Sequence, residues 1–407
     1  MIDDRVVFAQ MLRAIRRDLG LAVMPDIRSG EARLKAGMMH DMLGHMIAWS
    51  AEASAGDEGE FRRHFDTARR DAEEAVARLG ALEIEITAER LQRFLGQRMA
   101  GCAGAVVERV EPANGGYSKD TVLFGARLAD GTMLDGVIRR DLPFGPGENS
   151  AVDEFPLLRA LFGRGLPVAE PLWCETDAGW LGQPFIVCRR VPGAPNTEPW
   201  DQDEAVRRGV CLQLADLLAT LHAIDPAEIG MATDRTPAGE IGAYVDLFHD
   251  RWQRHKVYDS PVLDAAFRWL AENVPADLER VSLVHSDVGF HNILTENGRI
   301  TALLDWEFSH LGDPAEDLGY CRSRVEPLMP WDEFLAAYCA AGGAPYRESG
   351  ARFYEVWRGV RNAVCCAVAW NGFLDDRYPA LKMAYQGVPL YRMFILDVAE
   401  RLERATS

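Results

Sequence analysis

The sequence has no compact run of lysine and arginine, and its charge is strongly of one sign. It contains 44 basic and 62 acidic residues among 407, which gives a formal net charge of −18 at pH 7. Proteins that bind nucleic acids or anionic membranes neutralise phosphates with clustered Lys and Arg. We therefore expect neither a nucleic acid nor a membrane surface among the partners of this chain.

The sequence also lacks a CxxC pair, although it contains eight cysteines. Most of them have apolar neighbours, where a free thiol behaves as a small buried hydrophobic group. A chain of this length does not need disulfides to be stable. We predict free thiols and a reducing compartment. The cysteines are Cys102, Cys174, Cys188, Cys211, Cys321, Cys339, Cys365 and Cys366.

Long hydrophobic runs are absent as well. No uncharged apolar run reaches the roughly 18 residues that suggest a membrane-spanning helix. The first residues, "MIDDRVVFAQ", lack the basic-then-apolar order of a secretory signal. We expect a cytoplasmic protein.

The composition is that of a globular chain, with 48% hydrophobic and 26% charged residues. Its length allows two or three domains of roughly 100–200 residues. Residues 1–95 are expected to form an all-helical extension, because apolar residues recur there at three- and four-residue spacing. One role we consider for these helices is the formation of a homodimer. The expected helices cover Phe8–Leu19, Leu34–Met46, Phe61–Leu79 and, after Thr87, Leu91–Leu95.

Residues 96–190 have the pattern of a small lobe that mixes strands with one helix. Extended runs cover 105–110, 121–128 and 133–140, and Asp130-Gly131 between the last two predicts a hairpin turn. A helix is expected at Asp153–Phe162, with Pro156 tolerated only in its first turn. "QPFIVCRRV" predicts one more buried strand.

Residues 191–407 are expected to be mainly helical. Two short β-like runs, "SLVH" and "ALLDW", interrupt the helices, with a turn at Glu296-Asn297-Gly298 between them. The expected helices cover 210–225, 240–255, 262–272, 331–341, 351–370 and 390–403.

The segment that contains these two β-like runs also contains the residues that are candidates for catalysis. Asp287 and Asn292 are five residues apart in a loop, and Asp305 ends the following strand-like run. Carboxylate and amide oxygens are hard ligands that suit Mg²⁺. Phosphoryl transfer needs a positioned hydroxyl, a group to accept its proton, and metal ions at the phosphates. These three side chains supply those parts, although Asp and Asn are also common in ordinary turns.

Several segments together resemble the aminoglycoside phosphotransferase and choline kinase-like family. "HSDVGFHN" fits the loop H-x-D-x-x-x-x-N, and "LLDWE" stands where protein kinases have D-F-G. "LADLLATLHAIDP", "FSHLGDPAEDLGY" and "GGYSKDTVLF" with "VIRR" resemble the same family, over about residues 90–400. The resemblance implies an α+β, two-lobed protein kinase-like fold with a β-rich N-lobe (96–190), a mainly helical C-lobe (191–407), and ATP and Mg²⁺ as cofactors.

The resemblance also implies a role for each matching residue. Asp287 would be the catalytic base or the acid that orients the hydroxyl. Asn292 and Asp305 would hold Mg²⁺. The backbone of Val187 and Arg189, at the junction of the lobes, would face adenine.

The remaining implied roles concern the phosphates of ATP. Gly115, Gly116 and Ser118 would contact them from the glycine-containing loop. Arg139 would take the place of the phosphate-binding Lys of protein kinases, with Glu154 as its ion-pair partner. Arg is chemically suitable, because its planar fork binds phosphate and carboxylate in a bidentate manner.

Two positions depart from the family pattern. The family usually has Gly after the catalytic-loop His, where this chain has Ser286, and it usually has Ser-Asn where this chain has Ser118-Lys119. Neither departure removes a metal ligand, but the second bears on the phosphate contacts.

Neighbouring polar residues have simpler explanations. His285 is expected to brace the loop through hydrogen bonds rather than to shuttle protons. Asp313 and Asp317 are expected to cap a helix or to brace the same loop. His291 is either exposed or in contact with substrate, and Glu307 is close enough in sequence to Asp305 to bind metal through water.

The acceptor of the phosphoryl group is expected to be a small-molecule hydroxyl. Polycationic aminoglycosides need an acidic pocket, and the best acidic pair, Asp375 and Asp376, is followed by Arg377. We therefore favour a neutral, apolar or acid-bearing alcohol, such as a hydroxyacyl compound or its thioester. Two alternatives stay open, an aminoglycoside or other antibiotic O-phosphotransferase and a catalytically inactive nucleotide-binding partner module. The use of GTP in place of ATP is equally open.

Overall fold

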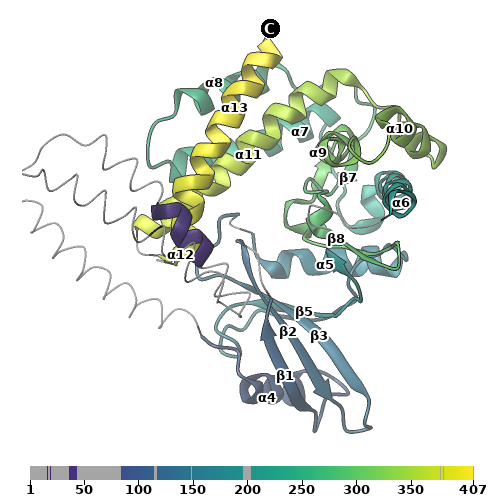
Figure 1. The fold of residues 1–407 in the computed structure, drawn as a ribbon, viewed down its shortest axis with the longest axis vertical. Coiled ribbons are helices and arrows are strands. Elements are labelled where there is room, and N and C mark those ends of the chain that lie inside the picture. Colours follow the sequence, from purple (N-terminus) through teal and green to yellow (C-terminus); the bar gives the residue numbers. More distant parts are fainter. Residues whose placement is uncertain are drawn as a thin grey trace, which may run out of the picture.

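The computed structural model describes residues 16, 19, 36–43, 84–113, 117–147, 149–195, 203–375, 377–378 and 380–406. Most of the expected N-terminal helices, and Gly115 and Gly116, lie outside these residues. Residues 36–43 are helical, with Met38 buried and the Asp41 carboxylate 3.4 Å from the Tyr385 hydroxyl of the C-terminal region. This stretch therefore contacts the C-lobe of its own chain (Figure 1).

The N-lobe is built on one antiparallel sheet of five strands in the order β1-β2-β3-β5-β4 (Figure 1). The three expected strands and the hairpin are confirmed, with Gly131 at a φ of 86° in the turn. "PLWCE", which shows no alternation of apolar and polar residues, forms a fourth strand that the sequence pattern did not predict. The strands are β1 (Val106–Pro112), β2 (Lys119–Arg127), β3 (Met133–Asp141), β4 (Pro171–Glu175) and β5 (Phe185–Arg189).

Helix α4 (Ala88–Arg98) packs on this sheet. Its N-terminus is capped by Thr87, whose hydroxyl accepts a hydrogen bond from the backbone N–H of Arg90 at 3.2 Å. Leu91, Phe94 and Leu95 have no exposed surface and pack among the side chains of β1, β2, β3 and β5. The last helix of the expected N-terminal extension is thus part of the core of the N-lobe, while the predicted domain limits stay predictions.

Helix α5 (Ala151–Gly163) connects the sheet with the C-lobe. Ser150 and Asp153 form a capping box at its start. Pro156 is the sixth residue of this helix, so the expectation that it lies in the first turn was wrong. The helix begins two residues earlier than expected because the capping box fixes its first turn, and the ring of Pro156 leaves the Val152 carbonyl without its helical donor.

The C-lobe is mainly helical, as expected. Two large hydrophobic clusters fill most of it, one around α6, α9 and α10 and the other around α7, α8, α11 and α13, and a smaller cluster contains Ala369, Tyr378, Ala380 and Met383. The elements are α6 (Glu204–Ala223), η3 (Pro226–Ile229), α7 (Pro237–His255), α8 (Pro261–Glu272), α9 (Ala315–Val325), α10 (Trp331–Ala340), α11 (Glu348–Leu374), α12 (Leu381–Tyr385), the π-helical turn η6 (Gln386–Leu390) and α13 (Tyr391–Thr406).

Short strands hold the interruption between α8 and α9. The turn at 296–298 is confirmed, with Asn297 at a φ of 52° and Gly298 at 74°. The two β-like runs are not paired with each other, however. β7 (Ser282–Val284) pairs with β10 (His310–Gly312), and β9 (Arg299–Leu303) pairs with β8 (Ile293–Glu296), which also pairs with β6 (Ala194–Pro195). The short helical turns η4 (Phe290–Asn292) and η5 (Trp306–Phe308) complete this region.

Two further expectations can be compared with the structure. All eight cysteines are free. Within the described ranges, every helix is too short or too polar to cross a lipid bilayer.

The packing of α4 predicts the effect of truncating its central aromatic residue. Phe94→Ala should lower the free energy of unfolding by about 3–5 kcal/mol, because it leaves a cavity between α4 and the sheet. Phe162→Ala is the matched control, since that ring is 44% exposed, and it should cost no more than about 0.5 kcal/mol. Denaturant titration measures both values. Equal losses in the two variants would contradict the placement of α4 in the N-lobe core.

Candidate active site

The backbone brings the three predicted oxygen ligands together. The loop after β7 carries Asp287 and Asn292, and Asp305 directly follows β9 and Leu304. The Leu304 N–H donates to the carbonyl of Asn292 at 2.8 Å, and the Leu304 carbonyl lies 2.9 Å from His285 Nε2. These two bonds hold the strand end that precedes Asp305 against the loop that carries the other two residues.

The Asp287 carboxylate is partly buried and is held by several donors. Asn292 Nδ2 donates to Asp287 Oδ2 at 2.9 Å and to the Asp287 carbonyl at 3.0 Å, and the Tyr320 hydroxyl also donates to the carboxylate. Burial raises the pKa of Asp287, but the hydrogen bond from His291 and the charge of Arg361 lower it more, so that it lies well below its usual range. Asp287 is therefore ionised at neutral pH and suited to accept a hydrogen bond from a hydroxyl.

Asp317, at the start of α9, holds the catalytic loop. This agrees with the expectation that Asp313 and Asp317 cap a helix or brace this loop. Its carboxylate has no exposed surface and accepts the backbone N–H groups of His285 at 2.9 Å and Ser286 at 2.6 Å. His222 Nε2 lies 3.0 Å from the same carboxylate, and His222 Nδ1 lies 2.8 Å from the Tyr338 hydroxyl. Burial raises the pKa of Asp317, but the hydrogen bond and charge of His222 outweigh it and lower that pKa.

His285 is a bracing residue, in agreement with its expected role. Its Nδ1 accepts the backbone N–H of Asp287 at 3.2 Å, so its proton lies on Nε2 and is donated to the Leu304 carbonyl. Burial lowers the pKa of His285 and keeps the ring neutral. A ring with both nitrogens engaged in this way is not free to shuttle a proton.

Ser286 occupies a backbone conformation that favours glycine. Its φ is 68°, in the left-handed region, which gives a physical reason for the glycine that the family usually has at this position. Two contacts hold it there: the Ser286 hydroxyl lies 3.2 Å from His310 Nδ1, and the buried Arg361 donates to the Ser286 carbonyl at 2.8 Å. Arg361 was not predicted from the sequence, although an arginine within the apolar stretch of α11 was a usable signal.

The residues near Asp305 fit a bound cation. Asp305 has a φ of 68°, and its Oδ1 accepts a hydrogen bond from Arg139 at 2.7 Å. Glu307 Oε2 is buried without a hydrogen-bond partner. Burial, together with the charges of Asp305 and Glu154, raises the pKa of Glu307 to about 8. This local excess of carboxylate oxygen is what a divalent cation would neutralise.

Mg²⁺ fits this set of donors better than a metal that needs many protein ligands. No group of three His, Cys, Asp or Glu side chains that could hold a metal occurs in the described part of the chain. Mg²⁺ is usually bound by one or two carboxylates, with waters and phosphate oxygens completing its shell. Asn292 Oδ1 and Asp305 would hold it, with Glu307 close by.

Arg139 and Glu154 form the ion pair that the resemblance implied. Arg139 on β3 donates to Glu154 Oε1 on α5 at 3.2 Å, and the same guanidinium contacts Asp305, so it links the N-lobe with the metal side of the C-lobe. Burial raises the pKa of Glu154, although the charge of Arg139 opposes this shift.

The other predicted nucleotide contacts are only partly described. Ser118 directly precedes β2. Val187 lies in the middle of β5, with β3 and β4 as neighbours on either side, and Arg189 ends this strand in an ion pair with Glu170 at 2.6 Å. The backbone available to adenine would therefore lie at the end of β5, and the adenine contact stays a prediction.

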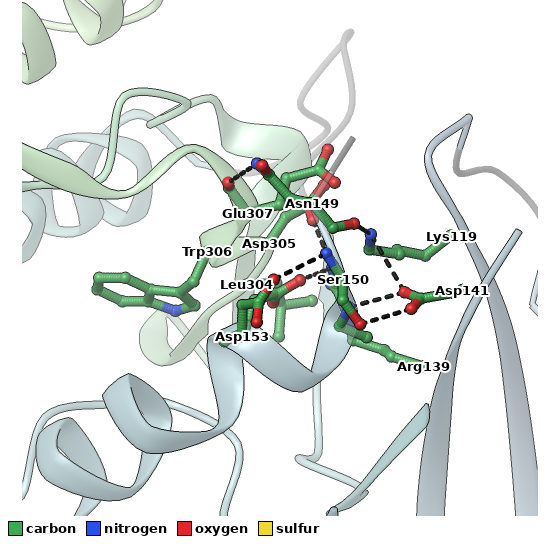
Figure 2. A network of polar contacts seen from close by, with 12 residues as sticks. Lys119, Arg139, Asp141, Asn149, Ser150, Asp153, Leu304, Asp305, Trp306 and Glu307 are labelled. Atoms are coloured by element: carbon green, nitrogen blue, oxygen red, sulfur yellow. Dashed lines mark hydrogen bonds and ion pairs between the residues drawn. The ribbon is translucent and has the colours of Figure 1, made fainter. Parts of the chain in front are cut away.

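Lys119 lies on the same face of the sheet as Arg139, since Lys119 pairs with Asp141 and Thr121 pairs with Arg139 in the β2–β3 ladder. Its side chain is buried, its Nζ lies 3.3 Å from Asp141 Oδ1, and it also contacts the Asn149 carbonyl (Figure 2). Lys119 also acts electrostatically on Glu307. The sequence presented Lys119 only as a departure from the family, whereas the fold places it on the face of the sheet that carries Arg139.

The loop before α5 joins the lobes beside this lysine. Asn149 Nδ2 donates to the Glu307 carbonyl at 2.8 Å, and Arg251 of α7 donates to Asn149 Oδ1 at 3.0 Å. Figure 2 shows Asn149 between Lys119 and Glu307. One side chain thus connects the N-lobe to the segment that follows Asp305.

The role of Asp317 as hydrogen-bond acceptor for the catalytic loop can be tested by substitution. Asp317→Asn should lower the free energy of unfolding by about 1–3 kcal/mol, because one buried backbone N–H loses its acceptor. A depressed pKa adds stability above the unfolded value of about 3.9, and this stability is lost as the pH falls through the folded value. The difference between the parent protein and the variant should therefore shrink below about pH 4.

The control for this variant is Asp130→Asn in the exposed hairpin turn, where the loss should be small. Denaturant titrations between pH 3 and pH 7 give the comparison. A loss in Asp317→Asn that is no larger than in Asp130→Asn would show that Asp317 does not hold the loop.

Comparison with known proteins agrees with this geometry. Residues 109–354, more than half of the chain, match the phosphotransferase enzyme family. The mouse protein named acyl-CoA dehydrogenase family member 11 is 31% identical over 252 residues, which cover 60% of this chain and 31% of the mouse protein. Its human counterpart is 27% identical over 257 residues, with the same shares, so this chain spans about a third of the length of these relatives.

Viomycin phosphotransferase of Streptomyces vinaceus is 30% identical over 215 residues, which cover 48% of this chain and 69% of that protein. A solved structure from Ralstonia eutropha, assigned to the aminoglycoside phosphotransferases, superimposes with a TM-score of 0.59 at 22% identity and covers 79% of this chain and 99% of the other. A mutant of the aminoglycoside phosphotransferase APH(4)-Ia, solved with ADP and hygromycin B, gives 0.51 at 19% identity, with 77% and 99% covered. These structural likenesses confirm the two-lobed α+β fold, and the sequence matches show that the chain belongs to the phosphotransferase enzyme family.

Proposed function

We propose that this chain transfers the γ-phosphoryl group of ATP to a hydroxyl group of a small molecule, with Mg²⁺ as cofactor. The observation that carries the proposal is the ionised Asp287 carboxylate held beside Asn292, with Asp305 joined to the same loop and to Arg139 across the cleft. These are the parts that phosphoryl transfer requires, arranged between two lobes.

The proposed reaction assigns each side chain one task. Asp287 accepts a hydrogen bond from the acceptor hydroxyl and orients its oxygen toward the γ-phosphorus, and the low pKa of Asp287 makes orientation its larger contribution. The new oxygen–phosphorus bond forms as the bond to the oxygen of ADP breaks, and the hydroxyl proton passes to Asp287. Asn292 and Asp305 would hold Mg²⁺, which would neutralise charge on the phosphates. Arg139 binds the phosphates directly.

The acceptor we favour is a neutral, apolar or acid-bearing alcohol, such as a hydroxyacyl compound or its thioester. The names of the mouse and human relatives refer to acyl-CoA dehydrogenases, which links acyl thioesters to proteins that contain a related segment. The acidic residue that a polycationic acceptor would need is not free, because Asp375 pairs with Arg377 at 3.0 Å. Both observations support an acyl-type alcohol.

A second candidate is an antibiotic O-phosphotransferase. The 30% identity with viomycin phosphotransferase favours it. Raised drug tolerance of a sensitive host that expresses the chain would support this candidate, and phosphorylation of hydroxyacyl compounds without drug tolerance would exclude it.

Substitution of Asp287 separates turnover from nucleotide binding. Asp287→Asn should reduce the rate of phosphoryl transfer by about 10²–10⁴-fold, the usual contribution of a positioned proton acceptor. Mg·ATP should still raise the melting temperature of this variant, and EDTA should remove the rise in both proteins. Asp259→Asn, at a largely exposed carboxylate, is the control.

Two outcomes would contradict the proposed function. One is the absence of any Mg·ATP-dependent rise in the melting temperature of the unaltered protein. The other is unchanged turnover in Asp287→Asn with ADP release as the readout.

Lys119 provides a test of the phosphate side of the cleft. Lys119→Met should weaken Mg·ATP binding by about tenfold, because it removes a buried positive charge on the face that carries Arg139. Lys256→Met is the control, since Lys256 pairs with the exposed Asp259 far from Asp305 in the sequence. Calorimetric titration with Mg·ATP measures the dissociation constants. Equal constants for the parent and Lys119→Met would show that Lys119 only stabilises the loop around Asn149.

A further inference from the structure

Ser286, the residue before Asp287, is held at all three of its polar groups by side chains from different elements. Its N–H donates to Asp317 of α9 at 2.6 Å, its carbonyl accepts from Arg361 of α11 at 2.8 Å, and its hydroxyl lies 3.2 Å from Nδ1 of His310 in β10. A residue other than glycine is strained in the left-handed region, and such a conformation persists only where its surroundings fix it. The fully buried Ser286 meets that condition.

His310 is itself fixed on several sides. Its Nδ1 lies 3.0 Å from the Phe308 carbonyl, which can only accept, so the proton of this nitrogen serves both that carbonyl and the Ser286 hydroxyl. Its ring stacks on the Tyr244 ring of α7, with the centres 3.6 Å apart and the planes 16° apart. Its Nε2 lies 3.3 Å from Glu316 Oε2. The imidazole therefore cannot turn away from Ser286 without losing these contacts.

Glu316, near the start of α9, lies between the two side chains that contact the carbonyl and the hydroxyl of Ser286. Its buried carboxylate accepts a hydrogen bond from Trp357 Nε1 at 3.1 Å through Oε1, which also lies 3.9 Å from Arg361 Nη1. Its Oε2 faces His310 at 3.3 Å, outside hydrogen-bond geometry. Arg361 and His310 thus share one carboxylate.

Two consecutive acids of α9 therefore act on the same loop residue. Asp317 accepts the Ser286 N–H directly, whereas Glu316 reaches the Ser286 carbonyl and hydroxyl through Arg361 and His310. The family usually has glycine in place of Ser286, and glycine has no hydroxyl. The contact with His310 thus accompanies the departure of this chain from the family pattern.

We propose that His310 and Glu316 are positioning residues for phosphoryl transfer, which set the direction of Asp287 by fixing Ser286. This inference rests on the proposed function, because it requires Asp287 to orient the acceptor hydroxyl. Misplacing an orienting group by about 1 Å can cost roughly 10²-fold in rate. Because neither residue is assigned to the nucleotide, the loss falls on kcat and not on the KM for Mg·ATP.

Variants of His310 separate positioning from packing. His310→Phe keeps a ring against Tyr244 but removes the donor to Ser286, and it should lower kcat about tenfold with an unchanged KM for Mg·ATP. His310→Asn keeps a donor near the position of Nδ1 and should retain most of the rate. The assay measures ADP release from Mg·ATP with a hydroxyacyl coenzyme A thioester as acceptor.

Ser286→Gly tests the same contact from the other side. It removes the hydroxyl and the backbone strain together, and glycine gains freedom in the unfolded chain, so the melting temperature should change little. The kcat should nevertheless fall about tenfold. The double variant Ser286→Gly with His310→Phe should be no slower than the slower single variant, because both substitutions remove one shared contact.

Glu316→Gln completes the set, and it should lower kcat with the KM for Mg·ATP unchanged. The control is His249→Phe on α7, where the imidazole lies 3.2 Å from the Gln253 side chain, and it should leave kcat unaltered. Hydrogen exchange of residues 283–292, followed by mass spectrometry, gives a readout that needs no turnover. Exchange there should be faster in His310→Phe than in the parent and in His249→Phe.

The outcomes distinguish this proposal from the proposed function. Losses of kcat that follow the melting temperature, or losses that multiply in the double variant, would overturn the positioning role. Parental kcat and parental exchange in His310→Phe would overturn it as well. Faster exchange in His310→Phe, in a chain that phosphorylates none of the acceptors offered with Mg·ATP, would support the fixing of the loop by His310 and count against the proposed function.

Discussion

The candidate site depends on one carboxylate, that of Asp317, which is fully buried. Asp317 accepts two consecutive backbone N–H groups of the catalytic loop, and His222 Nε2 lies 3.0 Å from the same carboxylate. Because these donors are buried, any other loop conformation would leave them without partners at a substantial cost in free energy. This fixes Ser286 in a left-handed conformation and, one residue later, fixes the direction of Asp287. The direction of the Asp287 side chain therefore depends on helix α9, which carries Asp317.

Charged groups are satisfied unevenly within the candidate site. Around Asp305 and Glu307 the carboxylates exceed the positive groups, and the raised pKa of Glu307 is the consequence. A fold that pairs the buried carboxylate of Asp317 but leaves an excess of carboxylate around Asp305 suits the cation of the proposed function.

The sequence predicted features that depend on neighbouring residues and missed contacts between residues that are far apart in the chain. Asp287, Asn292 and Asp305 were identified because their spacing within one short segment carries the chemistry. Arg361 was missed because its contact with Ser286 spans 75 residues, and the local signal, an arginine within an apolar stretch, does not indicate its partner. The pairing of β7 with β10 was missed for a similar reason, since a three-residue strand has little periodicity and its partner follows a second hairpin. The sequence marked Lys119 only as a departure from the family pattern. Its position on the same face of the sheet as Arg139 could be deduced only from the strand register.

The most direct test of the central claim is a crystal structure of the chain with Mg²⁺ and a non-hydrolysable ATP analogue. The account predicts a cation bound to Asn292 Oδ1 and the Asp305 carboxylate, a γ-phosphate that faces Asp287, and an Arg139 guanidinium that contacts phosphate oxygen. A cation bound elsewhere, with Asn292 and Asp305 directed away from the nucleotide, would contradict the account.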